Sequence, residues 1–167
     1  DQINEAPQMY KRDGVYYLTY SVGGTTSNFY SVAQALGSSP LGQFTKLNKA
    51  DGGLVLGTEM NWIQAAGTGH HSFTPIGDEL FIFHHEGADR YTIDSENRAI
   101  AYDRAGMAEN SKGQKVLAAN GPTSYSLQPL PAAISGYKNI APEAEVSVSG
   151  LKEGSDKKWL TDGFFAS

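Results

Sequence analysis

The stretch Met9-Tyr10-Lys11-Arg12-Asp13-Gly14-Val15-Tyr16-Tyr17-Leu18-Thr19-Tyr20-Ser21 decides the fold of this chain. It is rich in the aromatic and β-branched residues that suit a pleated sheet, and its centre carries the Asp-Gly pair of a tight hairpin turn. We therefore predict a strand, a turn and a second strand. Further along, residues 28–35 predict a third strand, 38–42 a turn and 44–47 a short fourth strand. The first unit is thus a four-stranded antiparallel meander.

The same pattern returns about 64 residues later, which is a sign of an internal repeat. Residues 69–85 again indicate strand, turn and strand, and residues 80–84 align with residues 16–20. Residues 98–103 and 115–117 predict the third and fourth strands of this unit. Repeated four-stranded meanders build β-propellers, which typically need about 4 to 8 blades to close. We predict an all-β chain holding two blades of a partial propeller, with further blades elsewhere; a two-sheet β-sandwich is the alternative.

The composition is that of an ordinary globular protein, with 167 residues of which 40% are hydrophobic and 19% charged. The net charge of −5 argues against a nucleic-acid partner, because such partners bind clustered Lys and Arg. The absence of cysteine excludes disulfides, thiolate metal sites and cysteine nucleophiles. No apolar run approaches the roughly 20 residues that span a bilayer, so no membrane partner is expected. The start at Asp1 suggests a fragment of a longer protein, although a processed N-terminus would look the same.

The sequence changes in character after about residue 130. Residues 131–138 indicate a linker between the repeat domain, 1–130, and a new domain that begins at residue 139 and runs to 167. Residues 139–149 alternate apolar and polar side chains, which indicates that a new domain starts here. A segment of about 30 residues cannot bury a core of its own. This tail is therefore expected to be truncated or to pack on the repeat.

Glu5 and His70 stand at nearly the same place, at the start of the first strand of each unit. That strand lines the central channel of a propeller, so a carboxyl group and an imidazole are expected to converge there. A carboxyl group that is partly desolvated among aromatic side chains, such as Tyr20 or Trp62, can serve as a general acid near neutral pH. A solvated Glu at a strand start is an equally good interpretation of the spacing.

Three motifs resemble the last two blades of glycoside hydrolase family 43, five-bladed propellers that act on arabinan and xylan. They are Glu5-Ala6-Pro7, Gly67-Thr68-Gly69-His70-His71-Ser72 and Ser39-Pro40-Leu41-Gly42-Gln43-Phe44, and the resemblance covers about residues 1–130. It implies that Glu5 is the general acid and that His70 contacts a calcium ion, often through water. Arg98 resembles an arginine that reaches the sugar; its alternative is a surface ion pair with Asp94 or Glu96. Trp62 is a candidate for stacking on sugar.

The resemblance implies hydrolysis with inversion of configuration, in which an acid and a base carboxyl group lie about 6.5–9.5 Å apart. Members of the family carry the base, and the Asp that tunes the acid, in earlier blades. Asp13, Asp78 and Asp103 lie in expected turns or at the end of a later strand, so they are poor substitutes. We therefore expect this chain alone to be inactive and to need the remaining blades of the same protein. The expected substrates are arabinose- or xylose-containing plant polysaccharides or oligosaccharides, and the expected location is secreted or periplasmic in a bacterium.

Two adjacent histidine pairs, His70-His71 and His84-His85, raise the question of zinc. Neighbouring strand residues point to opposite faces, so each pair offers only one ligand to a given metal site. A hard cation such as calcium fits the lack of thiolates better than zinc does.

The tail, from Asn139-Ile140-Ala141 to Thr161-Asp162-Gly163, resembles the start of a discoidin-type carbohydrate-binding β-sandwich; its alternative is an edge strand and loop over the last blade. For the whole chain, the alternatives are a non-catalytic carbohydrate-binding β module and a structural interaction domain.

Overall fold

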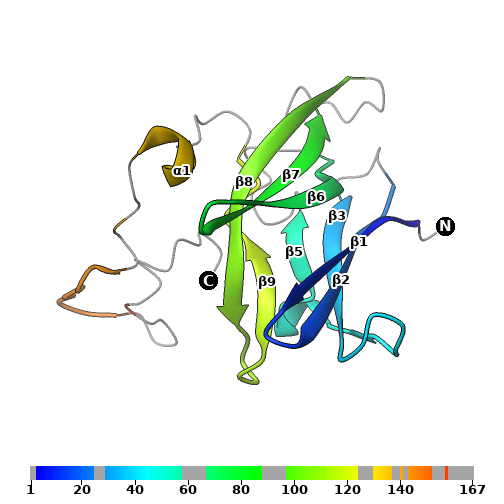
Figure 1. Cartoon of the computed structure of the whole chain (residues 1–167), viewed down its shortest axis with the longest axis horizontal. Coiled ribbons are helices and arrows are strands. Elements are labelled where there is room, and N and C mark those ends of the chain that lie inside the picture. The colour runs from blue at the N-terminus through cyan, green and yellow to red at the C-terminus, as the bar shows by residue number, and fades with distance from the viewer. Residues whose placement is uncertain are drawn as a thin grey trace.

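The computed structural model describes residues 3–24, 29–57, 67–87, 97–123, 130–136, 140, 143–151 and 157. These residues form two antiparallel sheets that pack face to face (Figure 1). The first sheet holds β1 (Asn4–Arg12), β2 (Val15–Val22), β3 (Ser31–Gly37) and β4 (Thr45–Lys46), and β5 (Leu54–Gly57) pairs with β3. The second holds β6 (Gly69–Ile76), β7 (Glu79–Gly87), β8 (Arg98–Glu109) and β9 (Lys115–Ala119). The helices assigned are short, η1 (Lys49–Asp51) and α1 (Ala132–Ser135).

The predicted all-β architecture is confirmed, and the first four strands of each sheet follow chain order, while β5 pairs back onto β3 in the first sheet. The first hairpin turns at Asp13 and Gly14, which both have positive φ, as an Asp-Gly turn requires. The third strand begins at residue 31 rather than 28 and runs two residues further than expected. The sequence reasoning missed β5, because a four-residue apolar run carries no alternation.

The internal repeat is present in the pairing of the strands. Glu5 pairs with Ser21 in the first hairpin, and Gly69 pairs with His85 at the same place in the second. In each sheet the register then shifts at a bulge, which lies between Glu5 and Gln8 in β1 and between Gly69 and Ser72 in β6. Bulges re-aim side chains, so the two sheets redirect their first strands at equivalent positions.

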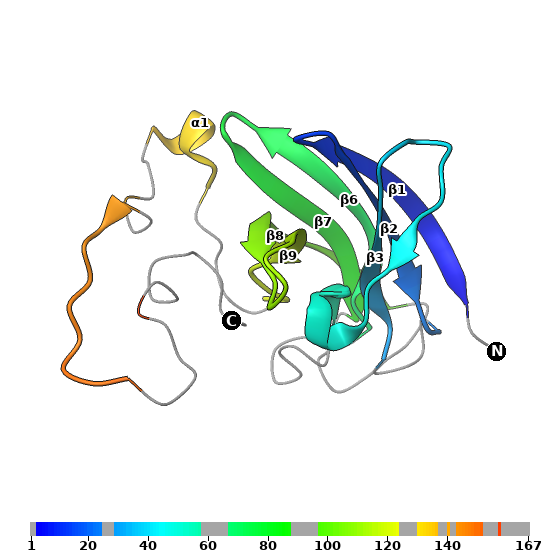
Figure 2. The same cartoon turned by 90° about the horizontal axis from the view of Figure 1, so that it is seen from below.

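The core lies between the two sheets, whose placement against each other Figure 2 shows from below. On β2, every second side chain faces the second sheet and is buried, whereas the intervening side chains of Tyr16, Leu18 and Tyr20 are half-buried on the other face. The same alternation on β7 turns Leu80 and Ile82 toward the first sheet. The buried cluster consists of Tyr17, Val32, Val55, Leu56, Phe73, Leu80, Ile82, Leu117 and Ala119.

Two glutamine side chains connect the sheets by bonding to main-chain groups. Gln8 accepts from the N–H of Phe73 at 2.6 Å and donates to its carbonyl at 3.3 Å. Gln34, which is fully buried, accepts from the N–H of Leu117 at 3.0 Å and donates to its carbonyl at 2.8 Å. The amide of Gln34 also donates to the carbonyl of Gly52 at 2.6 Å. These contacts fix the position of one sheet against the other.

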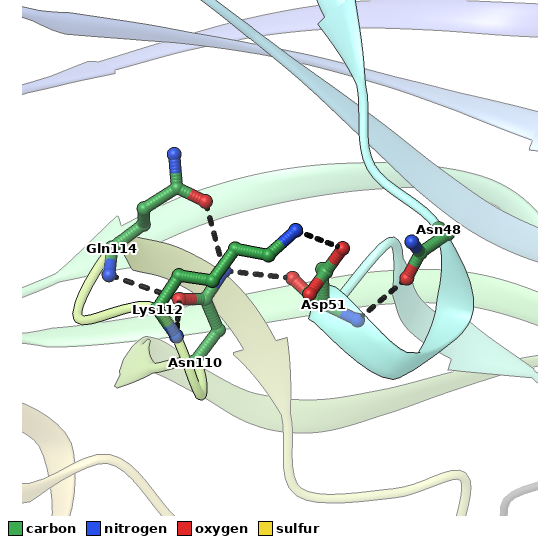
Figure 3. A network of polar contacts seen from close by, with 5 residues as sticks. All are labelled: Asn48, Asp51, Asn110, Lys112 and Gln114. Atoms are coloured by element: carbon green, nitrogen blue, oxygen red, sulfur yellow. Dashed lines mark hydrogen bonds and ion pairs between the residues drawn. The ribbon is translucent and has the colours of Figure 1, made fainter.

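A polar network at the β8–β9 turn joins the sheets at a second place (Figure 3). The ammonium of Lys112 lies 2.7 Å from Oδ2 of Asp51, and Asn110 donates to the carbonyl of Asp51 at 3.0 Å. Asn48 caps η1 by accepting from the N–H of Asp51 at 2.9 Å. Asn110 also holds its own turn, because its side-chain oxygen accepts from the N–H groups of Lys112 and Gln114.

The start of the expected linker is attached to the second sheet. The carboxylate of Glu79 accepts from Arg104 and from the N–H of Ala132 in α1, and Arg104 donates to the carbonyl of Leu130. Within residues 143–151 no strand is assigned, so the discoidin-type sandwich stays a prediction. Among the described residues, no helix has the length and apolar character to cross a membrane.

Candidate active site

Glu5 lies at the bulge of β1, and its half-buried carboxyl group is held by Tyr30. The hydroxyl of Tyr30 donates to Oε1 of Glu5 at 2.7 Å. Tyr30 directly precedes β3 and is fully buried, so its hydroxyl is fixed by packing. Glu5 is therefore a positioned carboxyl group, with one oxygen engaged.

Gly69 makes room for the Tyr30 ring. A Cβ at Gly69 would lie 2.2 Å from Cε1 of that ring, a separation that real Cβ atoms do not adopt. Gly69 occupies the place in the second hairpin that Glu5 occupies in the first. Burial, together with the hydrogen bond to Glu5, raises the pKa of Tyr30 to about 12. Tyr30 thus remains a hydrogen-bond donor throughout the neutral pH range.

Two imidazoles and a guanidinium continue the cluster. The ring of His85 stacks on Tyr30, with centroids 5.4 Å apart, and the ring of His70 lies 6.0 Å from His85. Nη1 of Arg98 lies 3.2 Å from Nε2 of His85. A guanidinium only donates, so Nε2 of His85 accepts and its proton sits on Nδ1. Burial, and then the charge of Arg98, lowers the pKa of His85 to about 4, so this ring is neutral near pH 7.

The structure therefore brings three of the four predicted site residues into one connected cluster. Glu5 reaches His85 through Tyr30, while Arg98 and His70 flank His85. The repeat correspondence is displaced by one residue, since the equivalent of His70 is Ala6. Both have positive φ, 51° and 49°. His70 and Arg98 are exposed.

The other residues named in the sequence analysis are not part of this described cluster. Trp62 lies outside the described residues, as do Asp94 and Glu96, the alternative partners of Arg98. The expectation that Tyr20 lies beside Glu5 is wrong. Glu5 pairs with Ser21, and Tyr20 points to the opposite face of β2 from Ser21, with the ammonium of Lys46 5.4 Å from its ring centroid. Alternation along a strand accounts for this, since neighbouring side chains face opposite ways.

Tyr30 and His85 are the residues that sequence reasoning missed as members of this cluster. Tyr30 is 25 positions from Glu5, and no local motif links them. The available signal was Gly69, whose small size indicates the close approach of another group.

The histidine pairs do split to opposite faces, as predicted. His71 is buried, and its Nε2 lies 2.8 Å from the hydroxyl of Thr19. Thr19 donates its own proton to the carbonyl of Gln8, so it accepts from His71. Burial lowers the pKa of His71 to about 4. His71 is therefore a neutral contact between β6 and β2 rather than a partner of His70.

The three aspartates considered as bases are poorly placed for that role. Asp103 lies within β8 rather than at its end, and it is fully buried. Its carboxylate is 3.0 Å from Nε2 of His84 and accepts from both the N–H and the hydroxyl of Thr123. Asp13 and Asp78 sit in exposed hairpin turns.

Calcium takes about 6–8 oxygen ligands, mostly from carboxylates, carbonyls and water. Within the described part of the chain, no three His, Asp or Glu side chains are grouped closely enough to hold a metal ion. These residues do not by themselves form a calcium cage, and the contact of His70 with calcium stays a prediction.

The two antiparallel sheets are arranged as adjacent blades of a β-propeller, and they place a positioned carboxyl group and an imidazole at the starts of their first strands. Residues 2–111 match the family model of glycosyl hydrolases family 43, and the chain belongs to this family.

Relatives and a solved structure agree with this family assignment. The chain is 37% identical over 115 residues to the β-D-galactofuranosidase xynD of Aspergillus niger, covering 66% of this chain and 30% of that protein. It is 33% identical over 82 residues to a β-xylosidase of Xylanibacter ruminicola, covering 49% of this chain and 21% of that protein. The crystal structure of a thermostable family-43 glycoside hydrolase superposes with a TM-score of 0.63 at 32% identity, covering 77% of this chain and 38% of that one. The chain thus spans well under half the length of these proteins.

Proposed function

We propose that this chain supplies the general acid, Glu5, to an inverting glycoside hydrolase that acts on arabinose- or xylose-containing plant polysaccharides or oligosaccharides. The observation that carries the proposal is the 2.7 Å hydrogen bond from Tyr30, which holds Oε1 of Glu5 beside the His70, His85 and Arg98 cluster. With Oε1 held, Oε2 is the oxygen that carries the proton. Membership of the family supports this role.

In the proposed reaction, Glu5 donates its proton to the glycosidic oxygen while the bond from that oxygen to the anomeric carbon breaks. A base on the opposite face of the sugar takes a proton from water, whose oxygen bonds to the anomeric carbon. Glu5 ends as a carboxylate, the base ends protonated, and the configuration is inverted. A general acid of this kind contributes about 10²- to 10⁴-fold in rate.

We propose that the base and the tuning Asp come from other blades of the same protein. Asp13 and Asp78 lie in exposed turns, and Asp103 is committed to His84 and Thr123. The face of the first sheet that carries Tyr16 and Leu18 is not covered by the second sheet, which makes it the proposed docking face for those blades.

Arg98 and His70 are the proposed contacts with substrate and metal. The exposed guanidinium of Arg98 can donate to sugar hydroxyls while its Nη1 stays on His85. Calcium at His70 would use water and oxygen ligands from other parts of the protein, and Trp62 remains the proposed stacking residue. We also propose a secreted or periplasmic location, where such polysaccharides are met.

The test compares the chain alone with the chain joined to the blades that precede it in its reading frame. Aryl α-L-arabinofuranosides, β-D-xylosides and β-D-galactofuranosides form the substrate panel, because the relatives bear these names. We expect no turnover by the chain alone. In the longer protein we expect turnover that Glu5→Gln lowers by at least 10²-fold, whereas the exposed control Glu109→Gln leaves it unchanged.

Turnover by the 167-residue chain that Glu5→Gln abolishes would contradict the proposal that this chain supplies the acid and other blades supply the base. Sugar binding without cleavage by the longer protein would instead favour a non-catalytic carbohydrate-binding module. The exposed Arg98 and His70 are compatible with that second function, because binding needs no base.

A further inference from the structure

A chain of hydrogen bonds connects the bulge of the second sheet to the carboxyl group of the first. The main-chain N–H of His70 donates to the hydroxyl of Ser21 at 2.8 Å. Ser21 in turn is hydrogen-bonded to Tyr30. The single phenol proton of Tyr30 goes to Glu5, so Ser21 is the donor in this contact. Tyr30 then donates to Oε1 of Glu5 at 2.7 Å.

We call this chain of hydrogen bonds, from His70 through Ser21 and Tyr30 to Glu5, the relay. Its direction is fixed by the first donor, the main-chain N–H of His70. A main-chain N–H donates and does not accept, so the hydroxyl oxygen of Ser21 is an acceptor and its proton is free to go to Tyr30. The phenol then has one proton to give, and it gives it to Glu5. Donors aligned in series polarise one another, so the last bond is strengthened by those before it.

Burial and backbone geometry also hold the groups of the relay in place. Ser21 and Tyr30 are both fully buried, which leaves their hydroxyls little room to find other partners. The N–H that starts the relay belongs to His70, whose φ of 51° is uncommon for a residue with a side chain. Outliers of this kind persist where the surrounding structure imposes them. The bulge of β6 thus aims its N–H into the first sheet.

We propose that Ser21 and Tyr30 are positioning residues that lock Oε1 of Glu5 and leave Oε2 as the proton-donating oxygen. This inference rests on the proposed role of Glu5 as the general acid. Because the relay begins on β6 and ends on β1, the acid is aligned only when the two blades are docked. Neither positioning residue touches the reacting atoms.

The kinetic test uses Tyr30→Phe, with Tyr17→Phe as the matched control. Tyr17 is equally buried, and its hydroxyl donates at 3.2 Å to the carbonyl of Lys115, away from Glu5. In the longer protein, we expect Tyr30→Phe to lower kcat by about 10- to 100-fold with little change in KM, because misplacement by about 1 Å costs this much. Removing a donor to a carboxylate favours its protonated form. The alkaline limb of the pH–rate profile should therefore move to higher pH in Tyr30→Phe but not in Tyr17→Phe.

A second readout needs no turnover. In the 167-residue chain labelled with ¹³C at the glutamate carboxyls, the signal lost in Glu5→Gln identifies Glu5. At a fixed pH its chemical shift should change in Tyr30→Phe, change less in Ser21→Ala, and stay in place in Tyr17→Phe, in line with the order of the relay.

The two readouts separate the relay from the proposed function. A longer protein that cleaves no glycoside, while Tyr30→Phe shifts the carboxyl signal of Glu5, would refute the catalytic role of Glu5 and leave the hydrogen-bond relay standing. Equal effects of Tyr30→Phe and Tyr17→Phe on both kcat and the carboxyl signal of Glu5 would overturn the relay, whatever the enzyme does.

Discussion

At Gly69 the strand β6 passes so close to the ring of Tyr30 that there is no space for a side chain. The same ring stacks on His85 and gives its proton to Glu5. A motif residue of the second blade thus sets the position of the Glu5 carboxyl group in the first. The motif could be found from the sequence, but the reason for its second glycine could not, because Tyr30 lies 39 positions earlier.

Gly69→Ala should therefore act on both stability and activity. The added methyl group must displace the Tyr30 ring, and overpacking of a tight site costs about 1–3 kcal/mol. We expect a loss of that size in the free energy of unfolding, measured by urea denaturation, together with a fall in kcat of the longer protein. Gly150→Ala is the control, since a Cβ there meets no atom of the described residues within 4 Å. Equal stability of the two variants would contradict the packing account.

His71 predicts a dependence of stability on pH. Its pKa is lowered from 6.5 to about 4 by burial, so the folded protein keeps it neutral. As pH falls below about 6.5, the unfolded chain binds a proton that the folded protein does not bind until about pH 4. The free energy of unfolding should thus decrease across this window, by up to about 3 kcal/mol from this residue.

The measurement is denaturation at pH 7 and pH 4.5 for the wild-type chain, His71→Gln and His70→Gln. Glutamine can still donate to Thr19 but does not titrate, so His71→Gln should lose part of the pH dependence. His70→Gln should keep it, because His70 is exposed. The same pH slope in His71→Gln as in the wild type would show that His71 titrates normally when folded.

At the scale of the strands, buried amides rather than ion pairs hold β3 and β9 together. Gln34 bonds to three main-chain groups, and it is fully buried. The Lys112–Asp51 pair spans the same two sheets, but the side chain of Lys112 is 62% exposed. Exposed ion pairs contribute about 0–1 kcal/mol, whereas each buried polar group left without a partner costs about 1–3 kcal/mol.

Gln34→Ala should accordingly destabilise the chain by about 3 kcal/mol or more, because it strips partners from Leu117 and Gly52. Lys112→Met should cost less than about 1 kcal/mol, and its effect should shrink in high salt. Thermal or urea denaturation of the two variants provides the comparison. A larger loss in Lys112→Met would reverse the proposed ranking of the two contacts.

Some strands can be predicted from the pattern of adjacent residues alone, and others cannot. The Asp13-Gly14 turn and the alternation on β2 predict the first hairpin, because both are properties of adjacent residues. The short strand β5 has no such signal; it forms because Val32 and Ala33 on β3 supply its partners. The expected linker likewise begins with a helix that Glu79 and Arg104 attach to the second sheet, which no local pattern indicates.

For the whole molecule, the internal repeat alone predicts that Glu5 and His70 lie near each other, since equivalent positions of adjacent blades converge. What the repeat could not supply are the contacts across it, such as Gln34 with Leu117 at a separation of 83 residues. The relay from His70 to Glu5 is of this kind, and it needs both sheets. The family match then connects this geometry with glycoside hydrolysis.

The central claim is that Glu5 protonates the departing oxygen, and the dependence on the leaving group tests it most directly. In the longer protein, kcat/KM of Glu5→Ala is compared with that of the wild type on glycosides with a 2,4-dinitrophenyl and with an alkyl leaving group. A dinitrophenolate departs without a proton, so we predict a small loss there and a loss of at least about 10²-fold on the alkyl glycoside. An equal loss on both substrates would contradict the role of Glu5 as the general acid.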